Sequence, residues 1–128
     1  MGLGYRPSLR QSEVMQVTIY HNPRCSKSRQ TLALLRENDV EPEIIEYLKT
    51  PPTPEELARV IGKLDRPPHD AVRAKEEAYA TSGLSAQSDV TAICEAIAAD
   101  PILLERPIVV KGDKAVIGRP PEDVLTLL

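Results

Sequence analysis

The sequence has no tryptophan and no phenylalanine, and only four tyrosines. A hydrophobic core must therefore be built mainly from leucine, isoleucine, valine and alanine, and a chain of 128 residues suits one compact domain. The chain has only two cysteines, which are too few for the disulfide framework of a small secreted protein. We therefore expect a single domain that works in the cytoplasm.

Basic charge and long apolar runs are also lacking. A net charge of −3 argues against a general nucleic-acid binder, which needs a basic face to neutralise phosphates. No apolar run approaches the roughly 20 residues that a membrane span needs. Residues 1–16 show neither the apolar stretch of a signal peptide nor a hydrophobic period, so we predict a loosely ordered extension before a domain at 17–128. Neither nucleic acid nor a membrane is expected as a partner.

Metal-ligand and phosphate-binding motifs are absent from the sequence as well. The two histidines, His21 and His69, are far apart, and no group of cysteines and histidines has the spacing of metal ligands. There is no glycine-rich phosphate loop and no dinucleotide-binding fingerprint. The sequence therefore predicts no metal site and no tightly bound cofactor.

Local patterns predict an α/β domain. A β-branched strand at 17–20, a helix at about 26–38 and a strand at 43–47 form a βαβ unit. Residues 53–99 then show only helical patterns and are predicted to be a helical insert, with helices at about 54–64, 70–79 and 89–99. A hairpin follows over 106–118, turning at 111–114, and a short helix begins near residue 120.

The helix expected after Thr53 has a particularly clear start. Thr53 can cap the helix, Pro54 suits its first position, and Glu56 would complete a capping box.

Cys25 is the first candidate for chemistry. It lies between the first predicted strand and the first turn of the next helix, where unpaired N–H groups and the helix dipole stabilise an anion. Arg24, Lys27, Arg29 and His21 add positive charge nearby. Such surroundings lower a cysteine pKa from about 8.5 to roughly 7 or below. We therefore predict a nucleophilic thiolate rather than a core cysteine.

The second cysteine of a Cys-x-x-Cys motif is missing, because Ser28 takes its place. A thiol without a local partner needs an external thiol to complete a redox cycle. Cys94 shares a helix face with Val90, Ile93 and Ile97, so we interpret it as a core residue rather than a resolving thiol.

Three arginines form a second group of candidates. Arg106 and Arg119 each precede a proline at a predicted strand boundary, and Arg73 lies in the helical insert. Guanidinium groups bind tetrahedral oxyanions through paired donors and remain charged. Spacing alone does not distinguish these three from the other arginines.

The segment 19–32, with its HNPRCSKSR motif around Cys25, resembles the active-site segment of the glutaredoxin-coupled arsenate reductase family. The likeness spans about residues 17 to 127. It continues in further motifs in the same order, at 41–52, 72–84, 101–110 and 118–120.

This resemblance implies a thioredoxin-like fold with a mixed four-stranded sheet and an inserted helical subdomain. It implies that Cys25 is the catalytic nucleophile, that His21 helps to keep it ionised, and that the bond before Pro107 is cis. It also implies a substrate-binding group, in which we include the serine in place of the second cysteine: Ser28, Arg73, Arg106 and Arg119.

The implied reaction is the reduction of arsenate to arsenite, an arsenic-detoxifying step. Glutathione or another small thiol would be the co-substrate, and glutaredoxin would be the partner. A monothiol glutaredoxin-like oxidoreductase is an alternative, which the spacing of Cys25 and Ser28 permits. A regulator of RNA polymerase like those of the Spx branch is another, although Ser28 removes the Cys-x-x-Cys switch that such proteins usually carry.

Overall fold

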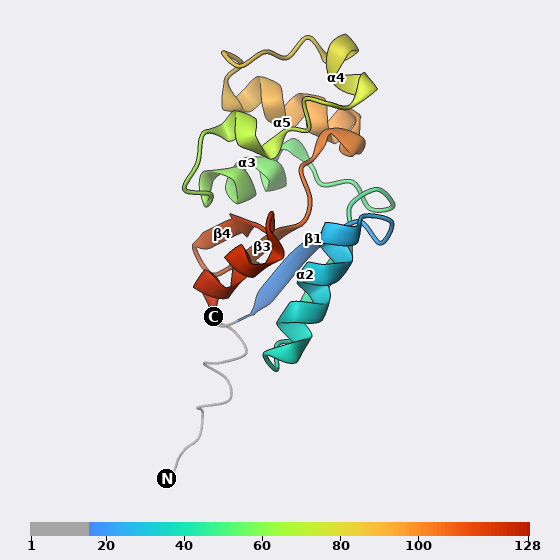
Figure 1. Cartoon of the computed structure of the whole chain (residues 1–128). Coiled ribbons are helices and arrows are strands. Elements are labelled where there is room, and N and C mark those ends of the chain that lie inside the picture. The colour runs from blue at the N-terminus through green and yellow to red at the C-terminus, as the bar shows by residue number, and fades with distance from the viewer. Residues whose placement is uncertain (1–15) are drawn as a thin grey trace.

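The computed structural model describes residues 16–128, so the extension predicted at 1–16 lies outside the described residues except for Gln16. Within this range, no helix is long and apolar enough to cross a membrane. The elements form an α/β fold in which helices cover both faces of one sheet (Figure 1).

The sheet is mixed and has four strands, as predicted. Its order is β2-β1-β3-β4, with β1 parallel to β2 and the other neighbours antiparallel. β1 and β2 are therefore joined by a crossover helix, whereas β3 and β4 form a tight hairpin in which Gly112 adopts a positive φ of 62°. The strands are β1 (Val17–His21), β2 (Glu43–Glu46), β3 (Ile108–Lys111) and β4 (Lys114–Ile117).

One face of the sheet is covered by the crossover helix α2 (Ser26–Glu37) and the C-terminal 3-10 helix η3 (Pro121–Leu127). Alternate residues of β1, Val17 and Ile19, are buried there against Leu35 of α2. This period of two is what a strand between two covered faces produces. The helix predicted after residue 120 is therefore present, in the tighter 3-10 form.

The opposite face packs against helices of the segment that was predicted to be helical. Tyr20, which points away from α2, belongs to this larger core. The helices predicted at 54–64 and 89–99 are observed as α3 (Pro54–Gly62) and α5 (Val90–Ala99). Asp89 caps α5 by accepting a hydrogen bond of 2.9 Å from the N–H of Ala92.

The helix predicted at 70–79 is wrong. The chain forms a short 3-10 helix (Pro68–Ala71), then an extended stretch, and then α4 (Glu77–Ser82). The extended stretch arises because Val72 forms an antiparallel bridge with Leu104. This long-range pairing outweighs local helical preference.

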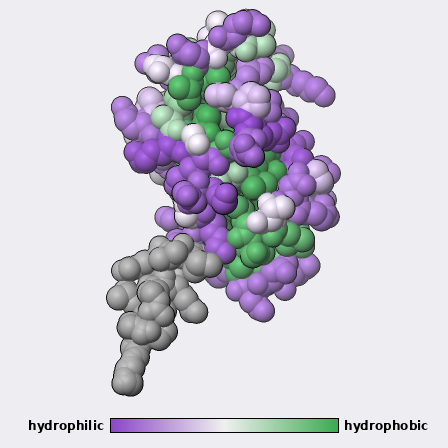
Figure 2. All heavy atoms as spheres, turned by 90° about the vertical axis from the view of Figure 1, so that its left-hand side faces the viewer, coloured by the Kyte–Doolittle hydropathy of each residue, from purple (hydrophilic) through white to green (hydrophobic). Residues whose placement is uncertain are grey.

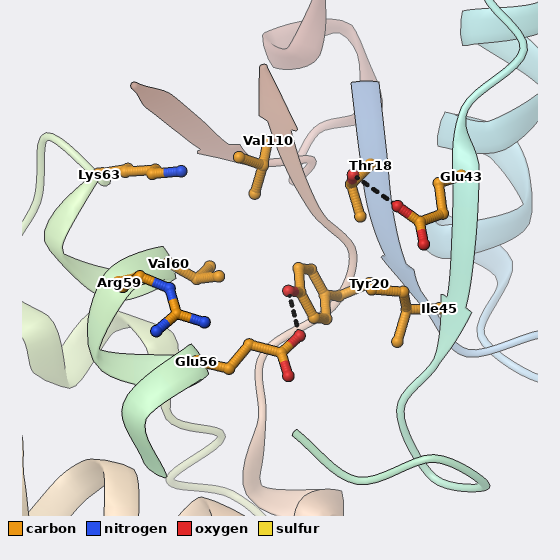
Figure 3. A pocket seen from close by; sticks show the side chains of 9 residues that line it. All are labelled: Thr18, Tyr20, Glu43, Ile45, Glu56, Arg59, Val60, Lys63 and Val110. Atoms are coloured by element: carbon orange, nitrogen blue, oxygen red, sulfur yellow. Dashed lines mark hydrogen bonds between the residues drawn. The ribbon is translucent and has the colours of Figure 1, made fainter. Parts of the chain in front are cut away.

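Thr53 caps α3 as predicted, because its hydroxyl accepts a hydrogen bond of 3.1 Å from the N–H of Glu56. The Glu56 carboxylate has another role than the predicted one. It accepts a 2.6 Å hydrogen bond from the Tyr20 hydroxyl and so ties α3 to the sheet, at a pocket that Figure 3 shows. Figure 2 shows the face that lies at the left in Figure 1, where hydrophilic residues surround a band of hydrophobic ones.

Candidate active site

Cys25 occupies the N-cap position of α2, immediately after β1 and its connecting turn. The turn is closed by a 3.0 Å hydrogen bond from the N–H of Cys25 to the carbonyl of Asn22, and the Asn22 side chain accepts from the N–H of Arg24. The Cys25 side chain makes no capping hydrogen bond as a neutral thiol, and the first N–H groups of the helix lie where they stabilise its thiolate.

The surroundings of the Cys25 thiol favour its ionised form. Burial by itself raises the pKa of Cys25, but the backbone N–H groups of Ser28 and Lys27 and the guanidinium of Arg106 outweigh it and bring the pKa below the ordinary value. The thiolate is therefore stabilised by the helix N-terminus and by an arginine from a distant part of the chain.

His21 and Ser28 lie under the active-site turn, and both are buried. Ser28 Oγ forms a hydrogen bond of 2.6 Å with His21 Nδ1 and accepts one of 3.0 Å from the N–H of Asn22. Burial lowers the pKa of His21, so its ring tends to be neutral. Both contacts hold the turn in place; the direct roles of His21 toward the thiol and of Ser28 toward the substrate remain predictions.

Two of the three predicted arginines lie beside Cys25. Arg119 Nη1 is 3.9 Å from the sulfur and donates a 3.0 Å hydrogen bond to the carbonyl of Arg106. Arg106 is the charged side chain that lowers the pKa of the thiol, and only 8% of this residue is exposed. Both residues precede cis prolines, Pro107 and Pro120, and the first of these cis bonds was expected from the family resemblance.

Arg73 reaches the same site from the insert. The bridge between Val72 and Leu104 is extended by a hydrogen bond of 2.7 Å from the N–H of Arg73 to the carbonyl of Leu103. A second bond of 2.8 Å runs from the N–H of Glu105 to the carbonyl of Ala71. This pairing aligns Arg73 with the segment that carries Arg106.

Two glutamates, which no sequence motif indicates, join the three arginines. Glu105 Oε1 is 3.0 Å from Arg73 Nη1 and 3.8 Å from Arg119 Nε. Glu76 Oε2 is 3.0 Å from Arg73 Nε and 3.8 Å from Arg106 Nη2. A cavity of about 340 Å³ opens beside this cluster, and its lining includes Arg73, Glu105 and Arg119.

Three buried side-chain donors have no partner in the described part of the chain, namely Arg106 Nε and the hydroxyls of Thr31 and Tyr47. Arg106 Nε has none, although its Nη1 donates to the carbonyl of Ile102 at 3.3 Å. The hydroxyl of Tyr47 makes no hydrogen bond of good geometry; burial raises its pKa to about 12, and the nearby Arg106 guanidinium and Asn22 side chain act in the opposite direction. Buried donors are usually satisfied, so an unpartnered guanidinium N–H near a thiolate indicates a place for an acceptor that comes from outside.

Cys94 is found where the sequence placed it, in the core. It lies on α5 and is buried in the cluster that contains Ile93 and Ile97, and burial raises the pKa of its thiol. Both cysteines are free. Among residues 16–128, no three His, Cys, Asp or Glu side chains are grouped so that they could hold a metal ion.

The mixed sheet, the helical cover and the cysteine at the start of α2 define a protein of the thioredoxin-like class. Residues 20–127 match the model described as "ArsC family". The chain therefore belongs to the ArsC family.

Individual relatives agree with this assignment. The arsenate reductase of Neisseria meningitidis serogroup A is 43% identical over 88% of this chain and 98% of that protein. A protein of Escherichia coli (strain K12) named "Uncharacterized protein YfgD" is 48% identical over 88% of this chain and 97% of its own length. Among solved structures, "Arsenate reductase from Vibrio cholerae" has a TM-score of 0.84 and 47% identity, and the match covers 90% of this chain and 99% of that one.

Proposed function

We propose that this protein reduces arsenate to arsenite, with the Cys25 thiolate as the nucleophile and glutathione and glutaredoxin as the electron donors. The observation that carries the proposal is the buried, unpartnered Nε–H of Arg106 beside a thiol whose pKa is lowered. An oxyanion held there would satisfy this donor while placing its central atom near the sulfur. The arsenate reductases among the relatives support arsenate as that oxyanion.

In the first step the Cys25 thiolate attacks arsenic(V). A sulfur–arsenic bond forms, an arsenic–oxygen bond breaks, and the leaving hydroxide takes a proton to depart as water. Arg106, Arg119 and the first N–H groups of α2 would stabilise the negative charge on the remaining oxygens. The covalent adduct divides a difficult two-electron reduction into easier steps.

In the second step a glutathione thiol attacks the adduct. Arsenic gains two electrons and leaves as arsenite, while the two sulfurs are oxidised to a mixed disulfide between Cys25 and glutathione. A glutaredoxin thiol then reduces this disulfide and restores Cys25. An external thiol is needed because position 28 is a serine, which cannot form a disulfide, and Cys94 is buried in the core.

The test measures arsenate-dependent oxidation of NADPH in the presence of glutathione, glutathione reductase and glutaredoxin. We expect turnover by the wild type, and a loss of at least about 10³-fold in Cys25→Ser, because the covalent step is removed. Cys94→Ser is the matched control and should retain turnover. Absence of arsenate-dependent turnover in the wild type would contradict the proposal. Reduction of a glutathionylated peptide in its place would favour the monothiol oxidoreductase.

A further inference from the structure

The charges of the three arginines, the two glutamates and the Cys25 thiolate balance one another before any substrate arrives. Arg73, Arg106 and Arg119 supply three positive charges, and the carboxylates of Glu76 and Glu105 together with the thiolate supply three negative ones. The carboxylates are not loose surface groups, because the side chains of Glu76 and Glu105 are only 26% and 20% exposed.

Glu105 occupies the central position in this arrangement. One oxygen, Oε1, contacts Arg73 and Arg119 and also accepts a 3.1 Å hydrogen bond from the backbone N–H of Arg106. The cavity beside the cluster is lined by the same glutamate and by two of the arginines that it contacts. An anion that reaches those arginines through this cavity must therefore lie close to a carboxylate.

A carboxylate in an anion site has two physical effects. It repels the incoming charge, and the repulsion is twice as large for a doubly charged anion as for a singly charged one. It also accepts hydrogen bonds but cannot donate them, so it suits an oxyanion that keeps an O–H group and disfavours one that has none. Both effects favour a protonated oxyanion.

We propose that Glu105 and Glu76 are specificity-determining residues that select the singly charged, protonated form of the bound oxyanion over a doubly charged form without O–H groups. This inference rests on the proposed oxyanion site. It assigns the arginines to affinity and the two glutamates to the choice of protonation state.

The experiment measures how well two tetrahedral anions protect Cys25 from alkylation by iodoacetamide at pH 6. It is a binding measurement and does not depend on enzyme turnover. Inorganic phosphate is then mainly a monoanion with two O–H groups, and sulfate is a dianion with none. In the wild type, phosphate should protect at a lower concentration than sulfate. In Glu105→Gln and in Glu76→Gln, the concentration of sulfate that gives half-maximal protection should fall by about tenfold. The corresponding phosphate concentration should fall by about threefold at most, because the repulsion removed from a monoanion is half of that removed from a dianion.

Two control variants separate charge at the site from other effects. Glu41→Gln removes the same charge from an exposed ion pair with Arg36 and should leave the protecting concentrations of phosphate and sulfate unchanged. Glu105→Asp keeps the carboxylate charge and should keep the wild-type preference for phosphate. Thermal unfolding of each variant verifies that it is folded before its protecting concentrations are compared.

The outcomes distinguish this inference from the proposed function. If both anions protect Cys25 but the glutamine variants keep the wild-type ratio, the role of the glutamates is overturned and the oxyanion site stands. If neither anion nor arsenate protects Cys25 in the folded wild type, the oxyanion site itself is overturned, and the inference falls with it.

Discussion

Two polar regions on different parts of this small fold contain the same kinds of residue, and only one of them has the features of an active site. The first is the cluster around Cys25, with Arg106, Glu105 and Tyr47. The second is the pocket in Figure 3, between α3 and the sheet, with Arg59, Glu56 and Tyr20. Residue types alone do not distinguish the two regions.

The regions differ in how their buried donors are satisfied. In the pocket the hydroxyl of Tyr20 donates to Glu56 at 2.6 Å, so both groups have partners inside the protein. In the cluster the hydroxyl of Tyr47 and the Nε–H of Arg106 are buried without any. The helix beside each region repeats the contrast, because the hydroxyl of Thr53 caps α3 by a hydrogen bond, whereas the first N–H groups of α2 act on the reactive thiol of Cys25. Unsatisfied donors mark a site prepared for a ligand.

Removing one arginine from each region tests this contrast with the largest expected effect. Arg106→Ala should lower kcat/KM for arsenate by about 10²–10³-fold, because it removes preorganised donors from the developing negative charge. Arg59→Ala removes the same side chain from the pocket and should change kcat/KM by less than about threefold, as a distant surface substitution does. The coupled NADPH assay measures both. Equal losses in the two variants would show that the contrast has no functional meaning.

The fold was largely predictable because its elements depend on local patterns. The β-branched run of β1, the Thr53 cap and the Gly112 turn are signals within a few residues, and each is observed. The predicted helix at 70–79 failed because a bridge between Val72 and Leu104, far apart in the sequence, determines the backbone there. Such pairings leave no local signal.

The site was predictable only in part, for the same reason. Cys25 was found from its position before a helix, and this feature is local. The three arginines came from a family resemblance, and Glu76, Glu105 and Tyr47 were missed. Nothing near these three in the sequence indicates that they meet. Glu105 directly precedes Arg106, but its contact with Arg73 depends on the bridge between Val72 and Leu104 and becomes visible only in the fold.

Loss of the Tyr20 hydroxyl sharpens the comparison through stability. Tyr20→Phe should lower the free energy of unfolding by about 1.5–3 kcal/mol, because it removes a hydrogen bond to a charged carboxylate and leaves Glu56 unpaired. Burial, together with Glu56, raises the pKa of Tyr20 well above its usual value. The stabilisation is therefore present below the pKa of about 10 of an unfolded tyrosine and declines as the pH rises above it.

Urea denaturation at pH 7 measures the loss, and the NADPH assay should show unchanged turnover by the folded variant. A Tyr20→Phe protein with the same free energy of unfolding as the wild type would mean that the hydrogen bond to Glu56 contributes little to stability. A folded variant that loses turnover would place the pocket within the active machinery.

The pH dependence of Cys25 alkylation tests which positive groups act on the thiol. In the wild type the rate should rise with pH and reach half its maximum below about 8.5, the pKa of an unperturbed cysteine. Arg106→Gln should move this midpoint upward by about one pH unit, because a stabilising charge is lost. Lys27→Gln should leave it nearly unchanged, because Lys27 acts through its backbone N–H. An equal upward shift in both variants would instead support the side-chain charges proposed from the sequence.

The smallest effect is expected from the same chemical change in the other region. Tyr47→Phe removes a buried hydroxyl that makes no hydrogen bond of good geometry, so the free energy of unfolding should change by less than about 0.5 kcal/mol or increase. Urea denaturation of Tyr47→Phe and Tyr20→Phe under identical conditions compares a satisfied hydroxyl with an unsatisfied one. If the two variants lost equal stability, Tyr47 would have a partner in the folded protein, and the contrast between the two regions would have to rest on Arg106 alone.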